Sequence, residues 1–314
     1  MSVLSSQAPS ETEGKSTQSD AVRAQIFQRL HPHAYLDRFL AEGFRPDGRT
    51  SDEWRDVFIN LGSISTADGS ALVKIGRTTV VCGVKAEIAE PELDTPDRGY
   101  IVPNLDLPAM CSPKFKPGPP SEEAQVLSER LNEALISANL LPLNTLCISP
   151  GHAVWCLYVD VTCISYDGNV FDAALLAMVA ALGNTTLPQA TYDPDTCLTT
   201  CTRSPRVPLA LQADRRVVGL SFGWVGGSTP SLLSDPAAFE EPLLAWSATV
   251  VIDAKGGLVS VERGEFGDSD SGDQEGFGLS NEKAGQQTSG ASTTLERCIL
   301  AAKERAAVLH KLLQ

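Results

Sequence analysis

The segment 153–182 constrains the fold more than any other part of the chain. It begins with AVWCLYVDVTCIS, in which nearly every position is apolar, as in a strand that is buried on both faces. Asp167-Gly168 then predicts a turn, and FDAALLAMVAAL predicts a helix that is apolar almost all round and ends at Gly183. A strand, turn and helix of this kind belong at the centre of a layered domain.

The region before this centre predicts a connected antiparallel sheet and a helix. The stretch 56–87 contains the strand-like runs VFINLGSIS, SALVKIG and TTVVCGVKAEI, and Gly76-Arg77 predicts a tight turn between the last two. The proline-rich segment 103–120 excludes a helix or a central strand and therefore predicts a loop. Ser121 then predicts the N-cap of an amphipathic helix.

Beyond Pro188 the pattern returns to strands. The runs VPLALQ, RVVGLSFGWVG and LLAWSATVVID are strand-like, and 253–257 predicts a turn into LVSVE. Strands, helix, strand, helix, strands and a last helix follow one another along the chain. This order predicts an α+β protein with its helices gathered on the faces of sheets.

The sequence also predicts where the folded part begins and ends. Residues 1–31 are expected to form a disordered tail, since the polar run at their start cannot offset the entropy of ordering, and 32–314 a single domain. Within it, about 263–291 is an acidic low-complexity insertion, either a loop or a disordered excursion. A capping box at Thr293 to Glu296 predicts a C-terminal helix over 293–313.

The net charge of −14 limits what the protein binds. Phosphate neutralisation by Lys and Arg supplies most non-specific affinity for nucleic acid, so a free-standing nucleic-acid-binding protein is disfavoured. Part of the acidity lies between Glu262 and Glu282, so the remaining chain is closer to neutral. Any contact with RNA is therefore expected to be local.

The eight cysteines favour a reducing compartment. Several lie in apolar runs such as TVVCGV, where cysteine behaves as a small buried hydrophobe, and no Cys-x-x-Cys pair occurs, so no metal site is expected. The N-terminus lacks the apolar core of a signal peptide, and no apolar run reaches the length of a membrane span. No membrane association is expected.

The residues alone give one candidate for chemistry. No nucleophile turn accompanies the histidines, and no glycine-rich phosphate loop occurs, so no cofactor is expected. Asp235, Glu240 and Glu241 form an acidic cluster after the strand-like SLLS. Two acids six positions apart could share a divalent ion or general-acid work, whereas the alternative is a solvated acidic loop.

Two stretches carry a resemblance to a known family. RPDGRTSDEWRDVFINLGSISTADGSALVKIGRTTVVCGVKAEI, with Arg45, Asp47, Gly48 and Arg49 as its signature, resembles the opening of RNase PH-family proteins. GYIVPNLDLPAMCSPKFKPGPPSEEAQVLS resembles the branch that forms the ring of the eukaryotic RNA exosome. The resemblance implies a two-layer RNase PH-like fold of pseudo-duplicated βαβα units, similar to the second domain of ribosomal protein S5.

The resemblance also bears on activity. Active members use phosphate to attack the 3′ end of RNA, which implies an arginine cradle for that phosphate and a nearby acid. Asp235 falls close to the acidic position of the family and Glu241 to a second one, but the loop before Arg130 carries Lys114 and Lys116 and no arginine. We therefore expect no catalytic residue and a subunit without activity. The alternative is an active phosphorolytic 3′–5′ exoribonuclease.

The remaining expectations concern the signature and the partners. The signature is expected to be structural, with Asp47 accepting hydrogen bonds from Arg45 or Arg49, against the alternative of direct RNA contact. Basic side chains are expected along an RNA path, namely Arg98, Lys114 and Lys116. The expected partners are other RNase PH-type ring subunits, cap proteins, an associated exoribonuclease and RNA, in the nucleus, the nucleolus and the cytoplasm.

Overall fold

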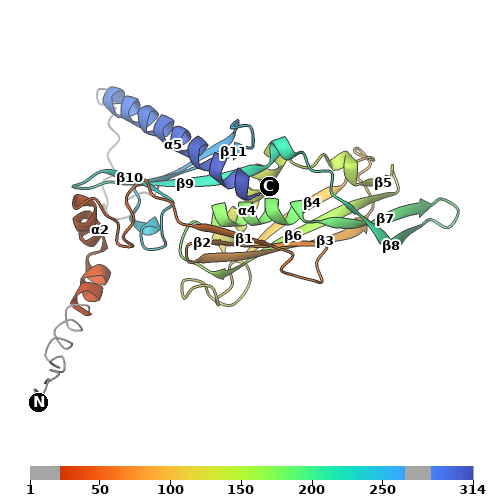
Figure 1. The fold of residues 1–314 in the computed structure, drawn as a ribbon, viewed down its shortest axis with the longest axis horizontal. Coiled ribbons are helices and arrows are strands. Elements are labelled where there is room, and N and C mark those ends of the chain that lie inside the picture. The colour runs from red at the N-terminus through yellow and green to blue at the C-terminus, as the bar shows by residue number, and fades with distance from the viewer. Residues whose placement is uncertain (1–21, 266–283, 314) are drawn as a thin grey trace, which may run out of the picture.

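The computed structural model describes residues 22–265 and 284–313 (Figure 1). Its largest sheet has six strands and lies in the first half of the chain, with the order β1-β2-β3-β6-β4, and β5 also pairs with β6. All pairs are antiparallel except β4 with β6. The elements of this half are α2 (Pro32–Ala41), β1 (Val57–Leu61), β2 (Gly69–Ile75), β3 (Thr78–Ala89), β4 (Tyr100–Asp106), α3 (Glu122–Ala138), η1 (Leu143–Leu146), β5 (Cys147–Ser149) and β6 (Ala153–Ser165).

The second half builds a four-stranded antiparallel sheet in the order β10-β9-β11-β12 and a separate two-stranded sheet, β7-β8. That two-stranded sheet is a hairpin that projects from one end of the molecule in Figure 1. The elements are α4 (Val170–Gly183), β7 (Thr186–Asp193), β8 (Leu198–Pro208), η2 (Ala213–Arg215), β9 (Val217–Val225), β10 (Ser231–Ser234), η3 (Glu241–Leu243), β11 (Trp246–Asp253), β12 (Leu258–Glu265) and α5 (Ala284–Leu312).

The elements stack in alternating layers, visible in Figure 1 as α5, the four-stranded sheet, α4 and the six-stranded sheet. Helix α4 contacts both sheets, and α5 packs on β9 and β11. Every α4 residue from Val170 to Leu182 is buried. Each sheet with its helix makes one two-layer unit, which confirms the predicted α+β class and the central place of the apolar helix.

The strand before α4 departs from its predicted burial. Strand β6 is buried at consecutive positions from Ala153 to Leu157, but Tyr158 and Asp160 are exposed. The second face of the six-stranded sheet is therefore open along this part of β6. The predicted turn at Gly76-Arg77 is confirmed, because Ile75 pairs with Thr78.

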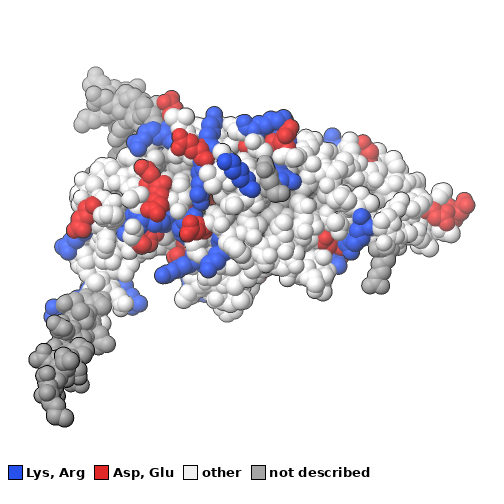
Figure 2. All heavy atoms as spheres, in the orientation of Figure 1, with Lys and Arg blue, Asp and Glu red and all other residues white. Residues whose placement is uncertain are grey.

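The hairpin β7–β8 was not predicted, and the VPLALQ run is not a strand of its own. Only Val207 and Pro208 of that run are in β8, and the rest is loop that leads into η2. The hairpin is rich in threonine and largely exposed, so it lacks the apolar alternation by which a strand is found in a sequence. Its tip carries the exposed acids Asp193 and Asp195, and acidic side chains gather at one end of the molecule in Figure 2.

Both predicted ends of the domain need correction. Residues 22–30 are helical rather than part of a disordered tail, because AVRAQIFQRL carries apolar residues at helical spacing; the rest of the predicted tail, 1–21, lies outside the described residues. Helix α5 begins at Ala284, so Thr293 lies inside the helix and is not an N-cap. Of the predicted insertion, 263–265 belongs to β12 and 266–283 lies outside the described residues.

All eight cysteines are free; five are buried, including Cys82 in TVVCGV, whereas Cys197 and Cys201 on the β7–β8 hairpin are exposed. Among residues 22–265 and 284–313, none of the helices has both the length and the apolar character needed to span a bilayer.

Candidate functional site

Two of the three acids that the sequence singled out are buried. Asp235, which directly follows β10, is 1% exposed and Glu240 is 2% exposed, so the interpretation as a solvated loop is wrong. An ionised carboxylate at such depth requires a cation or several donors, since the cost of removing it from water is otherwise large. The structure supplies three arginines, from the segment between α2 and β1.

Arg45 holds the segment that follows β10. Its Nε donates to Oε1 of Glu240 over 2.8 Å, and its Nη1 and Nη2 donate to the carbonyl oxygens of Ser234 and Asp235 over 2.7 and 3.0 Å. Arg45 itself is 1% exposed. A residue of the family signature is thus a fully buried link between two parts of the chain that are far apart in sequence.

The other signature residues form a tight loop beside Arg45. Asp47 accepts from Nε of Arg49 over 2.6 Å and from the backbone N–H of Arg49 over 3.1 Å. Gly48 has a φ of +88°, which favours glycine. Asp47 therefore orients Arg49, whereas Arg45 turns to Glu240 instead of Asp47.

Arg55 is the main partner of Asp235, and the sequence did not reveal it. Its Nη2 donates to Oδ1 of Asp235 over 2.6 Å and its Nε to Oδ2 over 2.7 Å, the bidentate geometry that makes such pairs strong. Its Nη1 donates to the carbonyl oxygen of Asp167 over 2.7 Å. A Cβ atom at Gly76 would lie 2.4 Å from Cδ of Arg55, so the glycine of the β2–β3 turn makes room for this side chain.

The turn between β6 and α4 completes the network. Nδ2 of Asn169 donates to Oδ1 of Asp235 and to Oδ2 of Asp172, both over 2.7 Å. Asp172 also accepts from the backbone N–H and the hydroxyl of Ser221 over 2.8 and 2.9 Å. The network thereby joins the six-stranded sheet, α4 and the four-stranded sheet.

Glu241, the first residue of η3, contacts the turn between β6 and α4 at a different point from Asp235. Its carboxylate accepts from the hydroxyl of Tyr166 and from the backbone N–H of Asn169, the latter over 2.7 Å. Burial raises the pKa of Glu241, and it also raises the pKa of Tyr166, next to the negative charge of Glu241. Asp235 and Glu241, which the sequence suggested could share an ion, therefore accept hydrogen bonds from different atoms.

The two central carboxyl groups have opposite pKa shifts. Burial alone would raise the pKa of Asp235, but the hydrogen bonds and charge of Arg55 outweigh it, so this pKa lies below its ordinary value. Asp172 is buried beside the charged Asp235 without a cation of its own, and burial raises its pKa to about 6. Asp235 is therefore held as a carboxylate, and Asp172 titrates near neutral pH.

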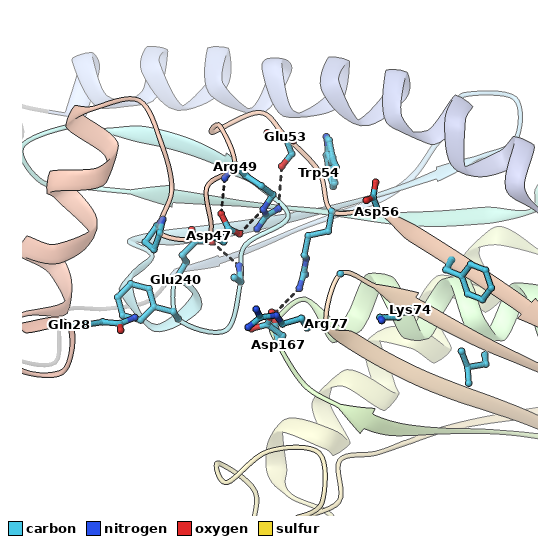
Figure 3. Close-up of a pocket in the computed structure, with 17 residues that line it drawn as sticks. Gln28, Asp47, Arg49, Glu53, Trp54, Asp56, Lys74, Arg77, Asp167 and Glu240 are labelled. Carbon is cyan, nitrogen blue, oxygen red and sulfur yellow. Dashed lines mark hydrogen bonds and ion pairs between the residues drawn. The ribbon is translucent and has the colours of Figure 1, made fainter. Parts of the chain in front are cut away.

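An open groove of about 1210 Å³ lies next to this network (Figure 3). Asp47, Arg49 and Glu53 line one side, and Lys74 and Arg77 lie across from them. Arg55 lines the groove, but Asp235 is not among the lining residues. A solute in the groove would therefore meet charges of both signs, and it would not reach the carboxylate.

The three basic residues expected on an RNA path do not lie together. Nζ of Lys114 is 2.7 Å from Oε2 of Glu123, in the first turn of α3, and Lys116 is exposed on the same loop. Arg98 lines a hollow beside the C-terminal end of α3, with Asn139. Since a helix rises about 1.5 Å per residue, Glu123 and Asn139 are about 24 Å apart along the axis.

The residues present offer no metal centre. Within the two described stretches, His, Cys, Asp and Glu side chains form no group of three or more suited to hold an ion. The first arginine of α3, Arg130, is engaged as well: it pairs with Glu262 and lies 4.7 Å from the ring centroid of Phe171.

Comparisons with known proteins agree on the family. The model of the 3′ exoribonuclease family, domain 1, matches residues 53–188. The chain is 42% identical over 236 residues to the exosome complex component Rrp43 of Schizosaccharomyces pombe, covering 75% of this chain and 86% of that protein. It is 37% identical over 223 residues to the exosome complex component Rrp42 of Methanothermobacter thermautotrophicus, covering 71% and 80%.

Solved structures extend the likeness to nearly the whole fold. A chain of the Archaeoglobus fulgidus exosome with RNA bound to the active site superposes with a TM-score of 0.70 at 28% identity, over 93% of this chain and all of that one. A chain of an archaeal exosome core gives a TM-score of 0.63 at 27% identity, over 92% and 99%. The protein described here therefore belongs to the RNase PH-type family of exosome complex components.

Proposed function

We propose that this protein is a ring subunit of an RNA exosome that contributes shape and contacts to the complex and no catalysis. The relatives named as exosome components support the ring role, since the chain covers most of their length. The fold supports it too, because it matches a chain of an archaeal exosome over that chain's full length. The active alternative requires the carboxylate of Asp235 to be available to a substrate, whereas this proposal has it bound within the fold.

The observation that carries the proposal is the closed environment of Asp235. Phosphorolysis places an inorganic phosphate beside the phosphodiester of RNA, and only cations free to bind can offset the repulsion between the two. Both oxygens of Asp235 accept from Arg55, and Asn169 and Arg49 complete its surroundings. A carboxylate held in this way neither exchanges protons with a substrate nor leaves its arginines available to an anion.

The cations farther out also pair with acids, although of these pairs only that of Arg45 is buried. Arg45 is bound to Glu240, Lys114 to Glu123 and Arg130 to Glu262. Releasing Arg45 to a phosphate would leave Glu240 buried without its partner, whereas the half-exposed Lys114 can leave Glu123 at little cost. The buried pair supports the expected loss of a phosphate cradle.

RNA, on this proposal, passes through the assembled ring to a nuclease carried by another subunit. Ring neighbours would cover apolar surface, which this chain exposes at Phe58, Leu61 and Met110. Cap proteins would complete the path, and Lys114 and Lys116 would lie beside it. The complex would work in the nucleus, including the nucleolus, and in the cytoplasm.

A phosphorolysis assay tests the proposal. The purified full chain is incubated with oligoadenylate and inorganic phosphate, with an active RNase PH enzyme as the positive control, and the release of nucleoside diphosphates is measured. We expect the chain alone to release no nucleoside diphosphate. We expect the same of a mixture with other ring subunits whose catalytic acids have been replaced, so that only this chain could be active. Phosphate-dependent release that disappears in Asp235→Asn, from a homohexamer in size exclusion, would establish the active alternative.

A second assay tests the ring role. The chain is co-expressed with candidate RNase PH-type ring subunits, and the mass of the purified complex is measured by light scattering. We expect a hetero-oligomer of ring size, and a chain that stays monomeric beside every RNase PH-type partner would contradict the proposal.

A further inference from the structure

A hollow at the C-terminal end of α3 is independent of the buried network. It has a volume of about 500 Å³, within the range of about 300–1,000 Å³ that is common for ligand pockets. Its wall is aliphatic and includes Leu135, Leu140 and Leu143. Ile136 stands at the wall and is 68% exposed, so it adds apolar surface at the rim of the hollow.

Polar side chains surround this aliphatic wall. Arg98, Asn132, Asn139 and Asn144 also line the hollow, and within residues 22–265 and 284–313 none of the four side chains has a protein hydrogen-bond partner or an ion pair. No Asp or Glu lines the hollow itself, where Arg98 is the charged side chain, and Glu129 lines the depression that continues from it along α3. An apolar surface with one cation and several unused amides fits a ligand that has a bulky apolar group next to an acid.

The backbone next to Arg98 is tightly packed. A Cβ atom at Gly99 would lie 2.5 Å from the carbonyl oxygen of Trp155 and 2.5 Å from Cβ of Leu146, so the chain passes tightly over β6 here. The N–H of Gly99 also donates to the carbonyl oxygen of Leu143 over 3.1 Å. Arg98 is therefore attached to a rigid part of the wall, although its own side chain is exposed.

The hollow continues along α3. A second depression of about 390 Å³ lies between α3 and β4 and shares Ile101 and Asn132 with the first. It reaches Gln125, so the two together follow α3 from Asn139 to Gln125. At about 1.5 Å per residue this trough is about 21 Å long, enough for about six residues of an extended chain at about 3.3 Å each.

We infer that this trough, which we name the α3 trough, binds a short extended peptide segment of a partner protein, with a bulky apolar side chain in the hollow and an Asp or Glu beside Arg98. Its length suits a peptide better than a small molecule. An aliphatic wall in which Tyr100 is the sole aromatic side chain of the hollow gives bases little to stack on, and a single arginine neutralises little phosphate, so RNA is disfavoured.

Peptide selection tests the inference and needs no identified partner. Random 12-residue peptides displayed on phage are selected on the immobilised full chain, and the enriched peptides are synthesised with a fluorophore for anisotropy. Arg98→Glu and Ile136→Glu alter the trough at exposed positions, so the fold is expected to persist, and circular dichroism verifies it. The matched controls are Lys255→Glu on an exposed turn and Val126→Glu, which is 59% exposed on α3 outside the trough.

We expect peptides that combine a bulky apolar residue with a nearby acid, bound about tenfold more weakly by Arg98→Glu and by Ile136→Glu and unchanged by both controls. Replacing the acid of the peptide by Lys should restore binding to Arg98→Glu, which a general loss of structure would not do. Failure to enrich any peptide, or binding that is insensitive to both trough variants, overturns the inference.

Two further outcomes would also overturn it. An oligouridylate that displaces the peptide and loses binding in Arg98→Glu would assign the trough to RNA. Loss of peptide binding when the chain enters an assembled ring would show that a neighbouring subunit covers the trough. Binding to the isolated chain and assembly of the ring are separate measurements, so failure of one does not decide the other.

Discussion

The side-chain amide of Asn169 donates to Oδ1 of Asp235 over 2.7 Å, and both residues have a left-handed backbone, with φ of 53° and 52°. Neither is glycine, so each conformation costs about 1 kcal/mol or more unless surrounding contacts compensate for it. Here two such residues contact one another inside the protein. The hydrogen bonds from Arg55 to Asp235 and from Asn169 to Asp172 supply that compensation.

This arrangement supports the proposed structural role of Asp235. Asp235 joins the turn after β6 to the end of β10 through Asn169, and it joins both to Arg55 before β1. Strained residues often persist at active sites because the surroundings hold them. In this chain the surroundings also occupy both oxygens of the carboxylate.

The Arg55–Asp235 pair should dominate the stability of the network. Arg55→Met leaves a buried carboxylate without its main cation, so we expect a loss of about 3 kcal/mol in the free energy of unfolding, measured by urea denaturation of the full chain. The exposed pair of Lys255 with Asp214 is the matched control, and Lys255→Met should produce no measurable change. Equal effects of the two substitutions would contradict a structural role for Asp235.

The double variant refines this test. Asp235→Asn removes the charge that Arg55 neutralises, so combining it with Arg55→Met should cost less than the sum of the two single losses. Additive losses would mean that the two side chains act independently.

Asp172 should make stability depend on pH between about 4 and 6. Its pKa is raised from 3.8 to about 6 in the folded chain, so the folded state holds this proton while the unfolded state has lost it. The contribution is fully present below pH 3.8 and is lost as pH rises through 6, by about 3 kcal/mol in total. Relative to Asp172→Asn, the wild type should therefore gain stability as pH falls from 7 to about 5; a difference between the two that does not vary with pH would refute this.

Substitutions at two glycines should distinguish the cost of a strained backbone conformation from the cost of a steric clash. Gly168 and Gly256 have nearly the same φ, 79° and 78°, but a Cβ atom at Gly168 would lie 2.4 Å from the backbone N of Ala238, whereas at Gly256 nothing lies within 4 Å. Gly256→Ala should cost about 1 kcal/mol for the conformation alone. Gly168→Ala should cost at least about 2 kcal/mol more, since the turn would move away from Asp235, and thermal denaturation of both variants measures the difference.

Lys114 and Lys116 should contact RNA only in the assembled complex. Replacing both by Gln should lower photo-crosslinking of RNA to this chain and reduce the slope of binding against salt by about two. Lys255→Gln, on an exposed turn, is the control and should change neither quantity. Unchanged crosslinking in the double variant would exclude the two lysines from the RNA path.

The sequence by itself determined the layers of the fold. The run of α4 is apolar over nearly its whole length, and such a helix is stable only between other layers, so its central place followed from composition and order. The strand β6 was predicted to be buried on both faces, but Tyr158 and Asp160 are exposed. The turns at Gly76-Arg77 and Asp167-Gly168 followed from local backbone preferences. The exposed hairpin β7–β8 did not follow, because the threonine-rich strands bury little apolar surface and carry no periodic signal.

Only the tertiary structure decided what the charged residues do. The string RPDGRTSDEWR contains Arg45, Arg49 and Arg55 at positions that look equally solvated, yet Arg55 binds Asp235 and Arg45 binds Glu240, 180 and 195 residues away. Local periodicity carries no information about such distant pairs, because a charge is stabilised by whatever the fold brings to it. The same acids are a reactive cluster or a buried support depending on which cations surround them, and that is set by the packing of the two sheets.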